Sequence, residues 1–302
     1  MAGPTAVGKS EVALILAEQI GAEIVSVDSM QVYRGLGIGT AKPSPAERER
    51  VPHHLIDICD LSQSFDAAQF VRLANDAVSA IHARGKVAIL CGGTGLYFKA
   101  FFHGLGNAPP TDPALRSAVE KLSQSELLDE LAKADFATFE KIDRQNRRRL
   151  VRAVEVIRLT GRPFSNQRAD WNSQGTGGGA PAAFFGISRS PDDLRARIDA
   201  RVDEMLRRGL VEETQRLVKA GLAANRTAMQ ALGYKQVVEF LQDARSLPET
   251  VELVKIRTRQ FAKRQMTWFR KYLSVQWHQL EPDSRNSLAA PEAAHSMLKK
   301  LS

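Results

Sequence analysis

The first ten residues contain two glycines, a lysine and a serine at a fixed spacing. Residues 3–10 read GPTAVGKS, which fits the pattern G-x-x-x-x-G-K-[ST]. The glycines let backbone N–H groups turn inward around an anion, and a helix that starts there adds its positive end. Lys9 would add a point charge and the Ser10 hydroxyl would ligate Mg²⁺. The alternative interpretation is a glycine turn before a helix, without a ligand. The residues predicted to bind phosphate are Gly3, Pro4, Thr5, Ala6, Val7, Gly8, Lys9 and Ser10.

Two polar residues follow apolar runs further along the chain. A phosphate-loop hydrolase needs a carboxylate after a second buried strand to organise Mg²⁺, but residues 86–90 lead into CGGT, which has none. The acid instead follows residues 25–27, as Asp28, where it would face an acceptor and act as general base. Thr94 could donate to a leaving-group oxygen. A helix cap, or for Asp28 an indirect Mg²⁺ contact, is the competing interpretation of each.

Two basic segments suggest a polyanionic partner. Residues 144–152 hold five arginines, and residues 255–271 hold seven basic residues and no acid, with Phe261, Trp268 and Phe269 interleaved. The chain has 42 Lys+Arg against 34 Asp+Glu, a net charge of +8. Cations neutralise phosphates and aromatic rings stack on unpaired bases, which favours RNA. Helical spacing favours core positions for Phe261, Met266 and Phe269, and a solvated basic surface remains the alternative for the charges.

The elements that would position these residues alternate between strand and helix. Apolar spacing predicts helices over 9–20 and 66–84, and strands over 22–27, 55–58 and 86–90. This order indicates an α/β fold with a parallel sheet covered on both faces. Only Met1 and Ala2 precede the phosphate loop, whereas such a loop follows a buried strand, so we expect the natural chain to begin several residues earlier.

The middle of the chain has a different character. Residues 107–170 show only helical patterns, and residues 172–181 (NSQGTGGGAP) have the composition of a linker. A strand is expected over 182–187, helices over 191–219 and 249–273, and a short strand over 275–277. We therefore predict a phosphate-loop core from residues 1–106 and 182–302, interrupted by an all-helical insertion at 107–181.

Composition excludes several other classes. The two cysteines are too few for a disulfide framework, and they are expected to be reduced thiols. The pair His53-His54 has no second cluster that would complete a metal shell. No apolar run reaches the ~18 residues of a membrane span, and no signal peptide is evident. A cytoplasmic protein without a membrane partner is expected.

Taken together, the motifs resemble those of the bacterial tRNA dimethylallyltransferases, the tRNA isopentenyltransferase family. The resemblance spans essentially the whole chain. It rests on GPTAVGKS (3–10), VSVDSMQVYRGLGIGTAKP (25–43), GGTGLYFKA (92–100), RRRLVRAVEV (147–156), RIDARVDEML (197–206), ALGYKQ (231–236) and FAKRQMTWFR (261–270).

The resemblance implies transfer of a dimethylallyl group from its diphosphate to N6 of the adenosine just 3′ of the anticodon, in tRNAs that read codons beginning with U. It implies that the phosphate loop holds this diphosphate with Mg²⁺ on Ser10. A monomer is expected, although the sequence has no feature that reveals the oligomeric state. The implied catalytic residues are Asp28, Thr94, Arg201 and Lys9. Arg201 is assigned by the resemblance alone, because its spacing otherwise suggests a surface charge.

The resemblance also implies contacts with the tRNA anticodon stem-loop. Its target base would leave its stack to reach the site. A phosphate-loop kinase and a non-catalytic RNA-binding protein remain the alternatives. The implied tRNA-binding residues are Asp28, Ser29, Met30, Gln31, Thr94, Arg116, Arg148, Arg149, Leu150, Val151, Arg152, Gln230, Ala231, Leu232, Gly233, Tyr234, Lys235, Lys263, Arg264, Gln265, Met266, Thr267, Trp268, Phe269 and Arg270.

Overall fold

The computed structural model describes residues 1–169, 183–281 and 289–300 of the chain. Its described residues separate into two compact units, one from Met1–Phe102 and Gly179–Ser302 and the other from His103–Gly178. The expected linker at 172–181 and the beginning of the strand expected at 182–187 lie outside the described residues. No described helix is both long and apolar enough to cross a bilayer.

The first unit is built on parallel strands. Strand order is β2-β1-β3 in one group and β4-β5 in the other. Ala2 joins the groups on the side of β4, because its N–H donates to the Phe185 carbonyl (2.8 Å) and its carbonyl accepts from Ile187 N–H (2.9 Å). On the side of β3, Gly92 N–H donates to the Met1 carbonyl (3.1 Å). The phosphate loop therefore leaves from the middle of the strands. The bounds are β1 Glu23–Val27, β2 His53–His54, β3 Ala88–Gly92, β4 Phe185–Ser188 and β5 Gln276–Gln279.

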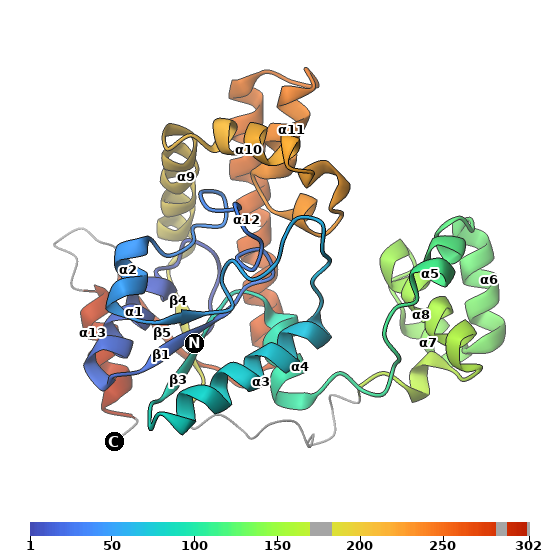
Figure 1. Cartoon of the computed structure of the whole chain (residues 1–302), viewed down its shortest axis with the longest axis horizontal. Helices are drawn as coiled ribbons and strands as arrows, with labels where there is room; N and C mark the ends of the chain where they lie inside the picture. Colours follow the sequence, from blue (N-terminus) through green and yellow to red (C-terminus); the bar gives the residue numbers. More distant parts are fainter. Residues whose placement is uncertain (170–182, 282–288, 301–302) are drawn as a thin grey trace. The chain divides into compact units, whose positions relative to one another are not determined.

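Helices cover both faces of these strands, which confirms the α/β class (Figure 1). Alternate residues of β1 point to opposite sides. Ile24 packs with the apolar residues of α1 and α13, whereas Val25 and Val27 pack with those of α3 and α4. The bounds are α1 Lys9–Ile20, α2 Pro45–Arg50, α3 Ala67–Ala83, α4 Gly95–His103 and α13 Ala289–Leu298.

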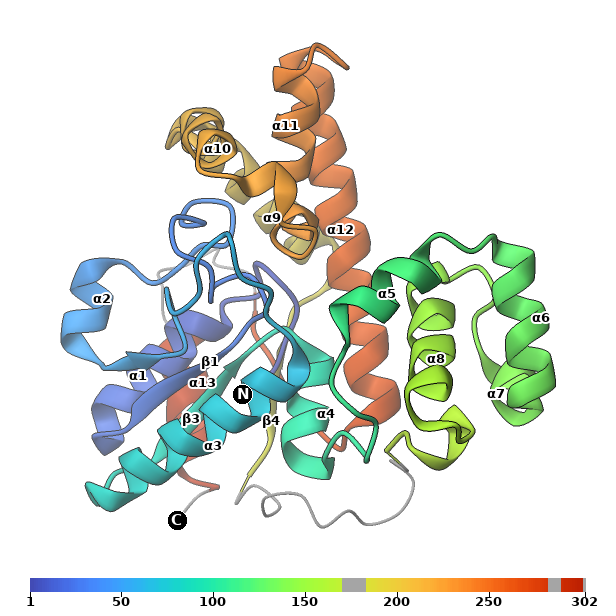
Figure 2. The ribbon, with the colours of Figure 1, turned by 45° about the vertical axis from the view of Figure 1, so that its right-hand side comes forward.

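A further group of helices stands beyond the carboxyl ends of β1 and β3. In Figure 2 the 26-residue α12 runs beside α4, and the contact between the Phe98 and Phe269 rings (6.0 Å between centroids) supports this arrangement. Helices α9 and α11 pack on α12. The bounds are α9 Pro191–Arg207, α10 Leu210–Lys219, α11 Tyr234–Leu241 and α12 Leu247–Tyr272, with single turns at Leu222–Ala224 and Ala228–Gln230.

The second unit is helical in its described part and has its own core. Leu127, Leu131, Leu150 and Val154 are fully buried at its centre. Helix α8 packs against α5 and α6. The bounds are α5 Pro113–Glu120, α6 Gln124–Ala134, α7 Phe136–Lys141 and α8 Arg147–Thr160, followed by a turn at Phe164–Asn166.

Three predictions of local structure were wrong. The strand expected at 55–58 lies instead at His53–His54, because Leu55 and Asp57 adopt positive φ angles (62° and 55°) that no strand allows. The helix expected over 191–219 is two helices that meet at Arg208 and Gly209. Phe261 was expected in the core, but 36% of its surface is exposed, whereas Phe269 is fully buried.

Candidate active site

Two arginine side chains donate hydrogen bonds to backbone carbonyls of the phosphate loop. Gly8, at φ 102°, ends the loop and caps α1. Arg189 Nε donates to the Val7 carbonyl (2.9 Å), and Arg197 Nε, on α9, donates to the Ala6 carbonyl (3.1 Å). Because these carbonyls face arginines, the neighbouring N–H groups are free to face the other side of the loop. Neither arginine was predicted from the sequence, since both lie almost 200 residues from their partners.

A cavity of about 490 Å³ lies beside this loop. Its walls include residues of the loop, of the first turn of α1 and of α9. Because Ser10 is exposed and carries no described hydrogen bond, its hydroxyl is available to a ligand. The lining residues are Ala6, Gly8, Lys9, Ser10, Glu11, Ala41, Glu47, Arg197, Ala200 and Arg201.

Two cations at this cavity have no carboxylate partner among the described residues. Lys9 Nζ makes only a long contact to the Pro4 carbonyl (3.3 Å), and Arg201 makes no described hydrogen bond or ion pair. Burial lowers the pKa of Lys9, as does the Arg201 guanidinium, while Cys91 and Asp28 oppose the shift. Burial also lowers the pKa of Arg201, against Asp28. Two neighbouring cations that are partly desolvated beside a cavity form a site for an anion.

Asp28 lies where β1 ends. Its Oδ1 accepts hydrogen bonds from Met30 N (2.8 Å) and Gln31 N (3.3 Å), so it closes a turn; the residues that follow form turns, and Asp28 caps no helix in the described chain. Its Oδ2 accepts no hydrogen bond from the part of the chain that the structure describes. One oxygen therefore fixes the carboxylate, and the other is free to accept a proton.

Thr94 follows β3, the strand that pairs with β1. Its backbone N–H donates to the Val27 carbonyl (3.2 Å), and its Oγ1 accepts from Ser29 N (3.1 Å). Because Oγ1 accepts from the loop after Asp28, the threonine hydrogen remains available to a ligand. The ends of β1 and β3 thus bring Asp28, Ser29 and Thr94 into one cluster.

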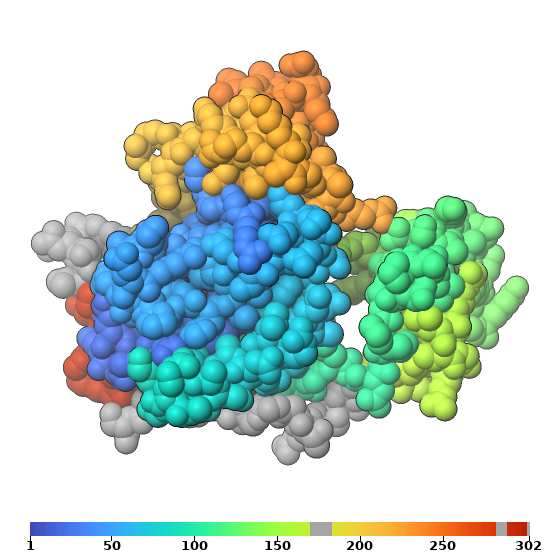
Figure 3. Space-filling view, viewed as in Figure 1, coloured from blue at the N-terminus to red at the C-terminus, as the bar shows by residue number. Residues whose placement is uncertain are grey.

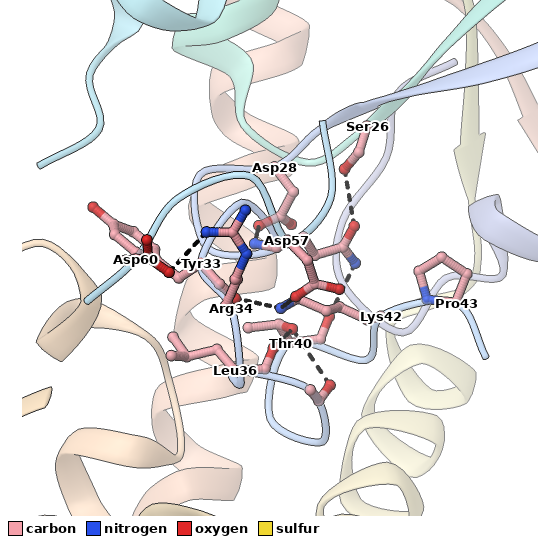
Figure 4. A network of polar contacts seen from close by, with 12 residues as sticks. Ser26, Asp28, Tyr33, Arg34, Leu36, Thr40, Lys42, Pro43, Asp57 and Asp60 are labelled. Carbon is pink, nitrogen blue, oxygen red and sulfur yellow. Dashed lines mark hydrogen bonds and ion pairs between the residues drawn. The ribbon is translucent and has the colours of Figure 1, made fainter. Parts of the chain in front are cut away.

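Polar side chains inside the loop from Asp28 to Pro43, together with Ser26 and Asp57 outside it, hold this loop in place (Figure 4). Gln31 Nε2 donates to the Thr40 and Ala41 carbonyls (3.1 and 3.3 Å), and Ser26 Oγ donates to Gln31 Oε1 (2.9 Å). Lys42 Nζ donates to the Tyr33 carbonyl and to Asp57 Oδ1 (2.5 Å). Gln31 therefore stabilises the conformation of this loop. Lys42 and Asp57 also stabilise it, and neither was predicted as a site residue from the sequence.

The outer end of this loop rests on α10 and α11. Tyr234 OH accepts from Gly39 N (3.0 Å) and donates to Glu213 Oε1 (2.6 Å), and burial raises the Tyr234 pKa. Figure 3 shows this contact as blue segments packed beneath the yellow and orange ones. Of the stretch assigned to tRNA at 230–235, Tyr234, Ala231 and Gly233 are buried, and Gln230 and Lys235 are exposed.

The basic stretch of α12 divides into two parts. Lys255 and Arg259 form ion pairs with Asp203 (2.6 Å) and Asp199 (2.9 Å) of α9. Further along, the exposed cations have no carboxylate partner among the described residues. They are Lys263, Arg264, Arg270 and Lys271.

The other residues assigned to tRNA on this stretch face inward to different degrees. Gln265 and Phe269 are buried, Met266 and Trp268 are partly buried, and Thr267 is exposed.

The second unit contains the remaining residues assigned to tRNA. Arg116 and Arg152 each donate to Glu155 Oε2 (2.9 Å), which is fully buried, so both support the fold of this unit. Leu150 and Val151 belong to its core. Arg148 and Arg149 are exposed.

Comparison with known proteins identifies close relatives. Residues 31–272 match the family model described as IPP transferase. The chain is 46% identical over 281 residues to a tRNA dimethylallyltransferase of Geobacter sulfurreducens, which covers 91% of this chain and 89% of that protein. A relative of the same name from Geotalea uraniireducens (tRNA dimethylallyltransferase 2) is 43% identical over 279 residues, covering 91% and 89%.

Solved structures give the same result. The crystal structure of a tRNA isopentenylpyrophosphate transferase from Bacillus halodurans is similar with a TM-score of 0.71 and 37% identity, covering 99% of this chain and 95% of that one. A eukaryotic dimethylallyltransferase acting on tRNA is similar with a TM-score of 0.77 and 26% identity, covering 99% and 78%.

Proposed function

The chain belongs to the IPP transferase family, and on this premise we propose that it transfers a dimethylallyl group from dimethylallyl diphosphate to N6 of the adenosine just 3′ of a tRNA anticodon. The observation that carries the proposal is the pair Lys9 and Arg201. These two cations lack a carboxylate partner among the described residues and border one cavity. The charge of Asp28, which keeps one oxygen free, acts on both of them. A diphosphate would neutralise both cations, and an acceptor amine would meet Asp28.

The reaction follows from these positions. The N6 lone pair of adenine attacks C1 of the dimethylallyl group, the C1–O bond breaks, and its electron pair leaves with the diphosphate. Asp28 Oδ2 accepts a proton from N6, which is needed because this amine is a weak nucleophile. Lys9, Arg201 and the Thr94 hydroxyl stabilise the negative charge that grows on the leaving oxygen. The products are N6-(dimethylallyl)adenosine and diphosphate.

Magnesium fits this site as an ion carried by the substrate. The described residues contain no cluster of three or more His, Cys, Asp or Glu side chains able to hold a metal by themselves. Ser10 offers one hydroxyl beside the cavity, and Mg²⁺ commonly binds through substrate phosphates and water with few protein ligands. Bound there, Mg²⁺ would supply additional positive charge to the leaving group.

We also propose that tRNA is the acceptor, held through the exposed cations of α12 and Arg149 of α8. Their charges are available to phosphates because they are exposed and have no carboxylate partner in the described chain. The target adenosine would have to leave its stack to reach Asp28. We propose that the enzyme works in the cytoplasm as a monomer; the free, buried state of Cys59 and Cys91 supports the reducing setting.

One assay tests the proposal. The protein is incubated with radiolabelled dimethylallyl diphosphate, Mg²⁺ and unmodified tRNA, and the digested tRNA is examined for prenylated adenosine. We expect label in N6-(dimethylallyl)adenosine, and none when the target adenosine is replaced by guanosine. Absence of label with a protein that binds diphosphate and tRNA would refute the proposal, and ATP consumption with a small acceptor would indicate a kinase.

A further inference from the structure

Gln265 of α12 makes two hydrogen bonds in the interior. Its Oε1 accepts from Thr5 N in the phosphate loop (2.9 Å), and its Nε2 donates to the Gly93 carbonyl (2.9 Å). Only 8% of its surface is exposed. One amide therefore connects two segments that are almost 90 residues apart in the chain, one on the proposed donor side and one next to Thr94.

The turn that carries Thr94 is fitted closely to α12. A Cβ on Gly93 would lie 2.3 Å from Gln265 Nε2, and a Cβ on Gly95 would lie 2.1 Å from the Trp268 ring. The glycines on each side of Thr94 therefore let this turn reach the helix. Substituting Gly93 would displace the Gln265 amide, and substituting Gly95 would displace the Trp268 ring.

The same turn reaches the acceptor side. Thr94 Oγ1 accepts from Ser29 N (3.1 Å), and Ser29 directly follows Asp28. Hydrogen bonds thus lead from Thr5 through Gln265 to Gly93, the peptide chain continues to Thr94, and a further hydrogen bond reaches the loop that holds the proposed general base. A glutamine suits this place, because its side chain supplies one donor and one acceptor without a buried charge.

We propose that Gln265 is a positioning residue that holds the phosphate loop in register with Thr94 and Asp28. The resemblance assigns Gln265 to the tRNA surface, but its side chain is buried and bonded to protein at both ends. The inference rests on the proposed function for the identity of the two substrates. It predicts that Gln265 controls diphosphate binding and turnover and has little influence on tRNA affinity.

The test uses Gln265→Met, which keeps the side-chain length and removes both hydrogen bonds. Gln260→Met is the matched control, because Gln260 is an exposed residue on the same helix. Calorimetry measures binding of inorganic diphosphate with Mg²⁺, filter binding measures tRNA affinity, and initial rates give kcat and KM. For Gln265→Met we expect about tenfold weaker diphosphate binding, a similar rise in KM for dimethylallyl diphosphate and about tenfold lower kcat, with tRNA affinity within twofold. The control should match the wild type.

Three results would overturn the inference. Unchanged diphosphate binding with weaker tRNA binding would make Gln265 an RNA contact. Wild-type kcat and KM with a lower melting temperature would make it a purely structural residue. Wild-type behaviour throughout would remove any role. If Gln265→Met does not fold, Gln265→Asn carries the same test, because it is one methylene too short to span both partners. If the wild type binds diphosphate but prenylates no tRNA, the proposed function fails while the diphosphate measurements still decide the role of Gln265.

Discussion

The two ends of strand β1 each carry a carboxylate, and the two are treated in opposite ways. At the amino end, Glu23 is almost fully buried and forms ion pairs with Arg84 (2.6 Å) and Lys86 (3.3 Å), and it also contacts His54 Nε2 (2.7 Å). The hydrogen bond from Arg84 is the main cause that lowers the Glu23 pKa to about 2, against the effect of burial. Its charge is fully balanced within the chain.

At the carboxyl end, Asp28 has no described cation within ion-pairing distance. Its fixed oxygen accepts from backbone N–H groups only. The nearby cations Lys9 and Arg201 are likewise without a carboxylate partner in the described chain. The comparison suggests a rule for this protein. Charged side chains that form ion pairs within the chain stabilise the fold, and charged side chains without such a partner bind a ligand. Each variant below tests this rule.

The largest effect is expected from Asp28→Asn. The amide oxygen can still accept from Met30 N, so the turn should stay in place, but the side chain can no longer take a proton. We expect turnover to fall by about 10²–10⁴-fold, with tRNA affinity and melting temperature close to the wild type. Initial rates, filter binding and thermal denaturation measure these quantities.

Asp28→Ala is the companion variant. It removes the base and the turn hydrogen bonds together, so it should lose as much turnover and some stability as well. Equal losses of tRNA binding and rate in both variants would show that Asp28 only positions RNA.

Arg201→Met should have the next largest effect. The leaving diphosphate would lose one cation, and loss of such a group commonly costs about 10²–10³ in kcat. The free energy of unfolding should not fall, because Arg201 has no described partner and removing it relieves repulsion with Lys9. Arg259→Met is the contrasting variant. Its free energy of unfolding should fall, because Arg259 is paired with Asp199. A clear loss of stability in Arg201→Met, measured by urea denaturation, would contradict the rule.

Glu23→Gln should reverse this pattern. The native pKa of Glu23, about 2, lies below its unfolded value of 4.5. Its contribution is therefore complete above about pH 5 and is lost as pH falls toward 2, and it amounts to about 3 kcal/mol at pH 7. We expect the variant to lose about this much unfolding free energy at pH 7 and roughly half as much at pH 3, while kcat at pH 7 is unchanged. An equal loss of unfolding free energy at pH 7 and pH 3 would show that Glu23 stabilises the fold through packing and that its ionisation contributes nothing.

The sequence predicts the parts of this site that depend on neighbouring residues. The phosphate loop, α1 and β1 follow from contiguous patterns, and Asp28 and Thr94 follow from the ends of two apolar runs. Parallel strands bring such ends to one edge. What it could not predict are contacts between distant segments. Gln265 bonds to partners 172 and 260 residues away, and Tyr234 bonds to a partner 195 residues away. For Gln265, the signal available in the sequence was the pair of glycines on either side of Thr94.

The basic segments show the same limit. Residue type alone does not distinguish a cation that is paired from one that is open. Lys255 and Lys263 occur in one stretch of sequence, yet within residues 1–169, 183–281 and 289–300 only Lys255 has a carboxylate partner, Asp203. In the second unit, Arg152 is paired with the buried Glu155, whereas Arg149 on the same helix is exposed. A count of basic residues therefore overstates the surface available to RNA.

Arg149→Ala should show the smallest effect, and it carries the comparison into the second unit. If Arg149 contacts a tRNA phosphate, its loss should weaken binding modestly and lower the slope of log K against log salt by roughly 0.7–0.9. Arg158→Ala is the control on the same helix, because Arg158 pairs with Glu130 (2.5 Å) and should leave the slope unchanged. Both slopes come from filter binding over a range of salt concentrations. If the two variants change the slope equally, pairing within the chain does not determine which cations meet RNA, and the rule drawn from β1 is restricted to the first unit.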